Sequence, residues 1–125
     1  RVAMNYYQGD IVLVNFMLYN PDETSRIEFK PHLAIVVSSN AHNNLTDSCY
    51  LLLISSKRII PENTMEITND MLVGMEMDKE SYAVCHIIDG YGVDDIVKKY
   101  GKIKREYFDK IMDMVLDKIF GIQLE

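Results

Sequence analysis

No stretch of this sequence is apolar for long enough to cross a bilayer. The longest apolar runs, Leu33–Val37 and Tyr50–Ile54, are far shorter than the roughly 20 residues that a membrane-spanning helix needs. The first residues also lack the basic segment and hydrophobic stretch of a secretory signal. We therefore expect a cytoplasmic protein with no membrane partner.

Cysteine is also scarce. The two cysteines, Cys49 and Cys85, both lie in apolar segments that resemble strands, which favours buried, reduced thiols in a reducing compartment. His32, His42 and His86 do not cluster with them at the spacing of metal ligands. We expect no metal and no cofactor, and we assign His32 and His42 to structure or solvent.

Basic residues are outnumbered, with 13 Lys and Arg against 19 Asp and Glu, and the net charge is −6. This balance argues against broad, non-specific binding of nucleic acid, which needs a basic surface. A small basic site on an acidic body stays possible, because the cations are grouped. Arg26 stands near Lys30, Lys57 stands beside Arg58, and a third group between residues 98 and 105 is typical of a solvated face.

The length and composition predict one globular domain over residues 1–125, with residues 1–7 as an N-terminal extension. Alternating or continuous apolar runs predict strands at Ile11–Phe16, Leu33–Val37, Cys49–Ile54, Thr64–Ile67 and Ser81–Ile88. Polar connections are expected at Met17–Glu28 and Ala41–Ser48, and a turn at Asp89–Gly92. The sequence does not decide whether Ile96–Ile103 contains a short strand.

From Lys104 onward the apolar period changes to steps of three and four residues, which predicts an amphipathic helix over residues 104–120. Its apolar residues are Tyr107, Phe108, Ile111, Met112, Met114, Val115 and Ile119. Lys104 stands where a capping Ser or Asp would be preferred. Short strands followed by one helix predict a mainly β protein, a small bent barrel with the helix on its side.

Methionine and tyrosine are abundant, with eight of each. Such a surplus of large apolar side chains is consistent with a dimer interface, and equally with a core padded by methionine.

The segment around Lys30 and Pro31 is the most informative for function. Pro31 has no N–H to donate, so we expect it at the first position of a strand, the buried strand that continues through Leu33–Val37. Ser38-Ser39-Asn40 ends that strand. Lys30 therefore places a cation at the start of a rigid central strand, where it can bind an anion.

The order of these segments resembles the MazF/PemK/Kid toxin family over residues 8–121. The resemblance rests on Gly9-Asp10-Ile11-Val12-Leu13-Val14, Lys30-Pro31-x-Leu33-x-Ile35-Val36, Leu52-Leu53-Ile54-Ser55-Ser56 and Ser81-Tyr82-Ala83-Val84. It implies an SH3-like barrel that forms a homodimer and cuts single-stranded RNA without metal. It also implies a cognate antitoxin as a partner.

The resemblance implies a site as well. Lys30 stands where the family has the Arg of an Arg-Pro pair, and Ser55 matches a Thr or Ser at the end of the third strand. Val84 and His86 stand where many members carry an Arg-x-Asp pair. Lys30 keeps the charge but loses the planar guanidinium that grips a phosphate with two hydrogen bonds.

We expect three catalytic residues, Lys30, Ser55 and His86. Lys30 would neutralise charge on the phosphate, Ser55 would donate to a phosphate oxygen, and His86 would act as base or acid. The expected products are a 2′,3′-cyclic phosphate and a 5′-hydroxyl. The residues expected to bind RNA are Tyr19, Arg26, Phe29, Ser56, Lys57 and Arg58.

A second hypothesis is a barrel of the same fold that acts by binding and not by catalysis. Such a protein would be a CcdB-like inhibitor of DNA gyrase or an inactive homologue of the toxins. The altered residues at positions 30 and 84 keep this alternative open.

Overall fold

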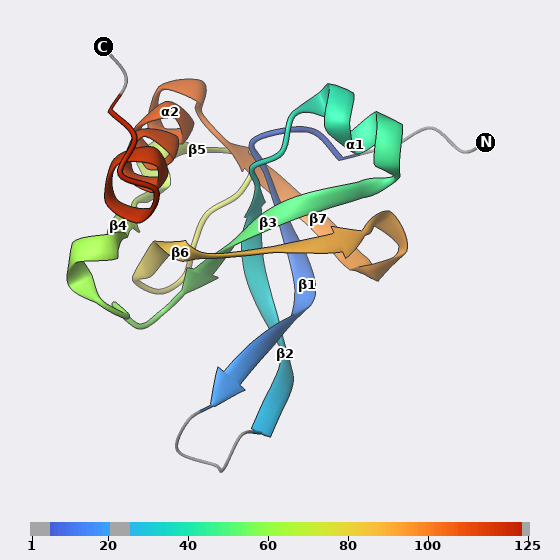
Figure 1. Cartoon of the computed structure of the whole chain (residues 1–125), viewed down its shortest axis with the longest axis horizontal. Helices are drawn as coiled ribbons and strands as arrows, with labels where there is room; N and C mark the ends of the chain where they lie inside the picture. The colour runs from blue at the N-terminus through green and yellow to red at the C-terminus, as the bar shows by residue number, and fades with distance from the viewer. Residues whose placement is uncertain (1–5, 21–25, 124–125) are drawn as a thin grey trace.

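The computed structural model describes residues 6–20 and 26–123, and the side chains of residues 19–20 and 26–28 are not among the parts described. Seven strands form one antiparallel sheet in the order β4-β6-β3-β2-β1-β7-β5. The strands are β1 (Asp10–Asn20), β2 (Arg26–Val36), β3 (Ser48–Ser55), β4 (Thr64–Ile67), β5 (Leu72–Val73), β6 (Ser81–Gly92) and β7 (Ile96–Ile103). The predicted mainly β architecture is confirmed (Figure 1).

The helices are α1 (Asn40–Thr46) and α2 (Arg105–Met114), and α2 continues into a π-helical turn, η5 (Val115–Ile119). In the part of the chain that the structure describes, 3-10 turns connect strands at η2 (Pro61–Asn63), η3 (Asn69–Met71) and η4 (Val93–Asp95). The segment Ile96–Ile103, which the sequence left undecided, is a strand over its whole length, β7.

The sheet curls because its two edge strands follow each other in the chain. β4 and β5 stand at opposite ends of the strand order, yet β4 ends at Ile67 and β5 begins at Leu72. Five residues of extended chain reach about 18 Å at most. The two edges must therefore lie near each other, which bends the sheet into a small barrel.

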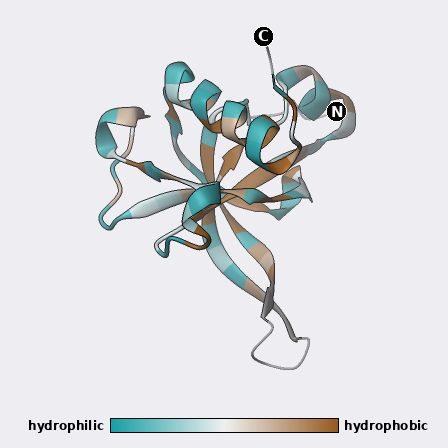
Figure 2. Ribbon diagram, turned by 60° about the vertical axis from the view of Figure 1, so that its left-hand side comes forward, coloured by the Kyte–Doolittle hydropathy of each residue, from teal (hydrophilic) through white to brown (hydrophobic). Residues whose placement is uncertain are grey.

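Both faces of the central strands are covered, which explains their unbroken apolar runs. On β3, Leu52 and Ile54 belong to the cluster that contains Phe108 of α2, whereas Leu51 and Leu53 belong to a second cluster on the other face. Figure 2 shows the apolar residues concentrated along the inner strands, with polar residues on the outer surface of the helices.

Helix α2 packs on the sheet as its periodicity predicts. Phe108, Ile111 and Val115 are buried in the first cluster, and the other predicted apolar residues of the helix pack against it. Lys104 is the N-cap residue and makes no side-chain capping bond, as expected. Gly121 adopts a φ of +65° just after the helix, a conformation that suits glycine at a helix end.

The predicted loop at Met17–Glu28 is wrong over most of its length. β1 and β2 form a long hairpin whose register runs through Phe16↔Lys30 to Asn20↔Arg26 (Figure 1). Met17 lies opposite Phe29 in this hairpin. Such pairing between strands cannot be seen along a single stretch of chain, so the polar residues between them dominated the prediction.

The predicted connection at Ala41–Ser48 contains the short helix α1. The side chain of Ser39 accepts a hydrogen bond from the backbone N–H of His42 at 3.1 Å, and Asp47 ends the helix in the left-handed conformation with φ +52°. A serine directly before the helix is an N-cap signal that the sequence carried. The abundance of Asn obscured it.

The predicted turn at Asp89–Gly92 is also wrong, because β6 continues through it and pairs with β3. Gly90 lies opposite Tyr50, and a Cβ on Gly90 would be 3.4 Å from the Tyr50 ring. This glycine therefore makes room for an aromatic ring on the neighbouring strand and does not mark a turn.

The predicted alternation along β6 fails at a bulge. The β3–β6 register passes from Ile54↔Ala83 to Leu52↔Ile88, so residues 84–87 of β6 face a single residue of β3. Ile87 consequently joins the cluster of Val84, and Ile88 packs with that of Cys85. The extra residues reverse which side chains point to which face.

Both cysteines are free and buried, as predicted. Burial raises the pKa of each thiol to about 11, and for Cys49 the nearby Asp10 charge adds to the effect. Within the described residues, no helix is both long and apolar enough to span a bilayer.

These buried thiols should be unreactive in the native protein. At pH 8 we expect an aromatic disulfide reagent to label neither Cys49 nor Cys85 at an appreciable rate, because the thiolate is scarce and enclosed. Full labelling should follow addition of denaturant. Prompt labelling of the native protein would contradict this packing.

Gly101 is predicted to be intolerant of any side chain. A Cβ there would lie 2.6 Å from both the Val73 carbonyl oxygen and Met75 Cγ. We expect Gly101→Ala to lower the free energy of unfolding by about 1–3 kcal/mol, measured by chemical denaturation. Gly90→Ala is the matched strand control and should cost less, and equal losses in the two variants would refute the close approach of β5 to β7.

Candidate functional site

β2 has two neighbours for only part of its length. It pairs with β1 from Arg26 to Ile35, but its pairing with β3 covers only Ala34–Val36. Pro31 lies within β2 and not at its first position, so that prediction is wrong. Pro31 stands where β2 has one partner strand, and a strand accepts proline at such an edge because no ladder hydrogen bond is lost.

A cavity of about 170 Å³ opens where β2 and β3 part. Its lining comes from β2, from the end of β3 and from the segment that leads into β6: Pro31, His32, Leu33, Ile54, Ser56, Met77, Asp78, Lys79 and Ser81. Polar and charged side chains thus meet beside the Lys30-Pro31 segment.

Lys30 is exposed on β2, opposite Phe16 of β1. It lies two residues before His32 on the same strand, so the two side chains leave the same face of the sheet. The pKa of His32 is lowered, first by burial and second by the Lys30 charge, and a hydrogen bond with the Ile54 backbone opposes the shift. The lysine charge therefore acts on a group that lines the cavity.

Ser55 ends β3 and is only 7% exposed. Its Oγ accepts a hydrogen bond from the backbone N–H of Lys57 at 3.0 Å, which fixes the turn after the strand, and its own hydroxyl proton remains able to donate. The pairing of β2 with β3 ends at Ala34↔Leu53, two residues short of His32 on β2 and of Ser55 on β3. Ser56 is exposed and lines the cavity.

His86 lies in the bulge of β6, opposite Leu53 and so farther from the end of β3 than Ser55. Its side chain is half-buried, and its Nδ1 is enclosed with no hydrogen-bond partner among the described residues. It is not one of the residues that line the cavity. Val84 is fully buried in the core, so the position that matches the family's Arg carries no polar group here.

The predicted RNA-binding residues differ in their exposure and in their contacts. Phe29 is 66% exposed and Lys57 is exposed. Arg58 Nε donates to Thr64 Oγ1 at 3.3 Å, and its guanidinium lies 6.0 Å from the centre of the Tyr82 ring. Tyr19 and Arg26 belong to the hairpin strands, but their side chains lie outside the described residues.

His32, which the sequence analysis assigned to structure or solvent, lines the cavity beside Lys30. The available signal was its position two residues after Lys30, which in a strand means the same face. His42 differs, because its ring packs on Tyr50 with 5.3 Å between ring centres and does not line this cavity.

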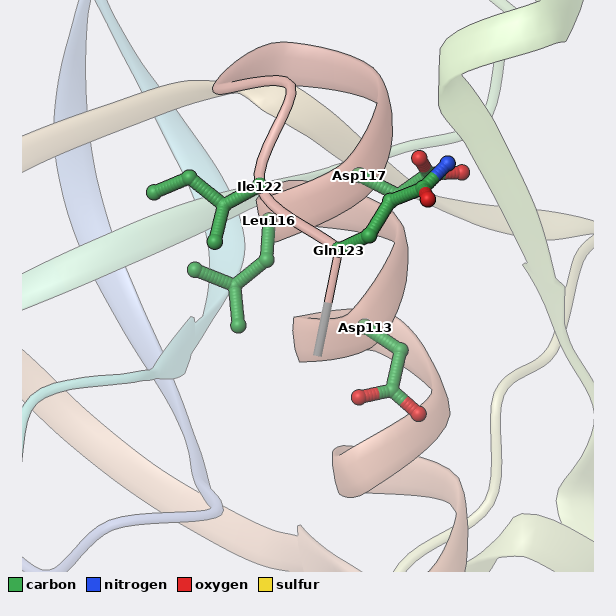
Figure 3. A pocket seen from close by; sticks show the side chains of 5 residues that line it. All are labelled: Asp113, Leu116, Asp117, Ile122 and Gln123. Atoms are coloured by element: carbon green, nitrogen blue, oxygen red, sulfur yellow. The ribbon is translucent and has the colours of Figure 1, made fainter. Parts of the chain in front are cut away.

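Another cavity, of about 380 Å³, lies elsewhere, between the end of the C-terminal helix and the residues that follow it (Figure 3). Its lining residues are Asp113, Leu116, Asp117, Ile122 and Gln123. Two carboxylates would repel a phosphate, so this cavity does not suit a nucleic acid.

The basic group at residues 98–105 is largely exposed, as predicted for a solvated face. Lys99 pairs with Asp10 at 3.2 Å, and Arg105 pairs with Asp109 at 2.9 Å. Over residues 6–20 and 26–123, no three His, Cys, Asp or Glu side chains are grouped so that they could hold a metal ion.

Solved structures share the fold of this chain at low sequence identity. An endoribonuclease from Mycobacterial species matches with a TM-score of 0.73 and 14% identity, over 100% of both chains. A MazE-MazF structure from Deinococcus radiodurans matches with a TM-score of 0.69 and 12% identity, over 96% of this chain and 100% of that chain. The predicted MazF-like fold is confirmed.

A third solved structure, an endoribonuclease in complex with its cognate antitoxin from Mycobacterial species, matches with a TM-score of 0.69 and 14% identity, over 96% of this chain and 99% of that chain. A comparison with curated proteins gives no sequence match. The family described as PemK-like, MazF-like toxin of type II toxin-antitoxin system matches residues 7–119. The chain therefore belongs to the PemK-like, MazF-like toxins of type II toxin–antitoxin systems.

Proposed function

We propose that this toxin is an endoribonuclease that cuts single-stranded RNA in the cytoplasm without a metal ion. The observation that supports the proposal is the cavity between β2 and β3, whose lining includes His32 and Ser56, with the Lys30 charge acting on His32. Family membership supports it, and so do structural neighbours that are named endoribonucleases.

In this proposal the phosphate at the cut lies over the end of β3. Lys30 neutralises the charge that grows on the phosphate oxygens, and Ser55 donates its hydroxyl proton to one of them. Ser56 contributes a second hydroxyl from the cavity wall. Attack by the neighbouring 2′-hydroxyl then gives a 2′,3′-cyclic phosphate and a 5′-hydroxyl.

The family resemblance makes His86 one candidate for proton transfer in this reaction. Its Nδ1 is enclosed, so the Nε2 atom would exchange the proton. Phe29 and Tyr19 would stack on bases, and stacking is worth roughly 1–3 kcal/mol per base where it occurs. Arg26, Lys57 and Arg58 would contact the RNA backbone.

The proposed partners are a second copy of the chain and a cognate antitoxin. Met17 and Phe29 are paired across the hairpin and are 42% and 66% exposed, which gives an apolar surface suited to a partner. Two neighbouring structures hold a toxin of this fold together with its antitoxin. An antitoxin that covers the hairpin would also block access to Lys30.

The proposal predicts metal-independent cleavage that depends on position 30. In excess EDTA we expect purified protein to cut single-stranded RNA, and Lys30→Ala to lower the rate by roughly 10²-fold, because a charge on the transition state is left unmatched. Lys118→Ala is the matched control, an exposed lysine on the C-terminal helix, and should cut at the unaltered rate. Mass spectrometry of the products should show cyclic phosphate ends.

Ser55→Ala should also slow cleavage, and circular dichroism should confirm that the variant remains folded despite losing the hydrogen bond to Lys57. Intact RNA with folded wild-type protein would contradict the proposal. Growth arrest without RNA cleavage, unaffected by Lys30→Ala, would favour the non-catalytic barrel instead.

A further inference from the structure

We propose that His32 is the general base of this site, the group that takes the proton from the attacking 2′-hydroxyl. The inference rests on the proposed RNA cleavage and adds to it a catalytic residue. It is carried by the position of His32 in the wall of the cavity, beside the Lys30 charge and in contact with the Ile54 backbone of β3.

The backbone holds His32 in a defined place. β2 carries it on the same face as Lys30, and Ser55 stands on β3 two residues beyond the last β2–β3 pair, Ala34↔Leu53. A hydrogen bond with the backbone of Ile54 further limits the orientation of the ring. The imidazole is therefore held in the cavity wall beside the Lys30 charge, and a general base requires such a defined position.

Burial and the Lys30 charge favour a neutral ring. The charged residues at the cavity are Lys30 on β2 and Asp78 and Lys79 in the segment before β6. Burial is the largest cause that lowers the pKa of His32, and the Lys30 charge is the next. A lowered pKa keeps the imidazole unprotonated at neutral pH, and only an unprotonated ring can accept a proton.

His86 is less well placed for this role. It does not line the cavity, and one of its two ring nitrogens is enclosed without a partner among the described residues. His32 has the Lys30 charge beside it, whereas His86 stands opposite Leu53 in the bulge of β6. The base is thus assigned to the strand that carries Lys30.

The proposed step balances as follows in atoms and protons. His32 accepts the 2′-hydroxyl proton while the 2′ oxygen bonds to phosphorus, and the bond from phosphorus to the 5′ oxygen breaks. The Lys30 ammonium gives a proton to the departing 5′ oxygen. Proton transfer from the His32 imidazolium to the Lys30 amine, directly or through water, restores both groups.

The test compares three histidine variants on one single-stranded RNA in EDTA. We expect His32→Gln to lower kcat by about 10²–10⁴-fold with little change in KM, because a general base acts on the chemical step. His42→Gln is the matched control, a half-buried histidine that packs on Tyr50. A loss in His86→Gln that exceeds the loss in His32→Gln would overturn the assignment.

The pH dependence of the cleavage rate distinguishes a catalytic His32 from a structural one, because loss of a structural residue would leave this dependence unchanged. Since the pKa of His32 is lowered, the rate of the wild type should hold below the ordinary histidine pKa of about 6.5 and fall only at more acidic pH. His32→Gln should lose this acid limb, and free imidazole should restore part of the rate of His32→Ala. An acid limb unchanged in His32→Gln would contradict the proposal.

A titration without RNA separates this inference from the function on which it rests. By NMR, the His32 ring should titrate below an ordinary histidine, and Lys30→Met should raise its pKa because the repelling charge is gone. An inactive wild type would refute RNA cleavage itself. An active wild type with full activity in His32→Gln would refute the assigned base alone.

Discussion

The separation of β2 from β3 is the feature on which the candidate site depends. The two strands are hydrogen-bonded from Val36 to Ala34, and beyond that pair they part. Beyond that pair the backbone of β2 makes no ladder hydrogen bonds with β3. Proline is therefore accepted there, and side chains can line a cavity. A sheet that continued its pairing to Lys30 would leave no such space between the strands.

The same geometry explains why polar groups gather at this end of the barrel. The adjoining runs, Leu33–Val37 and Leu51–Ile54, contribute apolar side chains to both core clusters. Ser55, Ser56 and His32 stand at the first positions where the core ends. A rigid apolar core thus positions the groups that would meet a phosphate, as a functional site on stable strands requires.

Much of this fold could be predicted from the sequence, because its central strands and its last helix carry strong local patterns. Burial is predicted by the unbroken apolar run at Leu33–Val37 and by the steps of three and four residues from Tyr107 to Ile119. The hairpin of β1 and β2 could not be predicted in the same way, because the pairing of Met17 with Phe29 leaves no pattern along the chain. The bulge in β6 likewise depends on its neighbour β3.

For the site, Lys30 and Ser55 could be proposed from the order of the segments, whereas the place of His32 needed the structure. The most direct measurement is a crystal structure with an RNA whose 2′-hydroxyl at the cut is methylated. The account predicts one phosphate in contact with Lys30 Nζ and Ser55 Oγ, with the His32 ring against the methylated 2′ oxygen. RNA bound along residues 98–105, with no phosphate near Lys30, would contradict it.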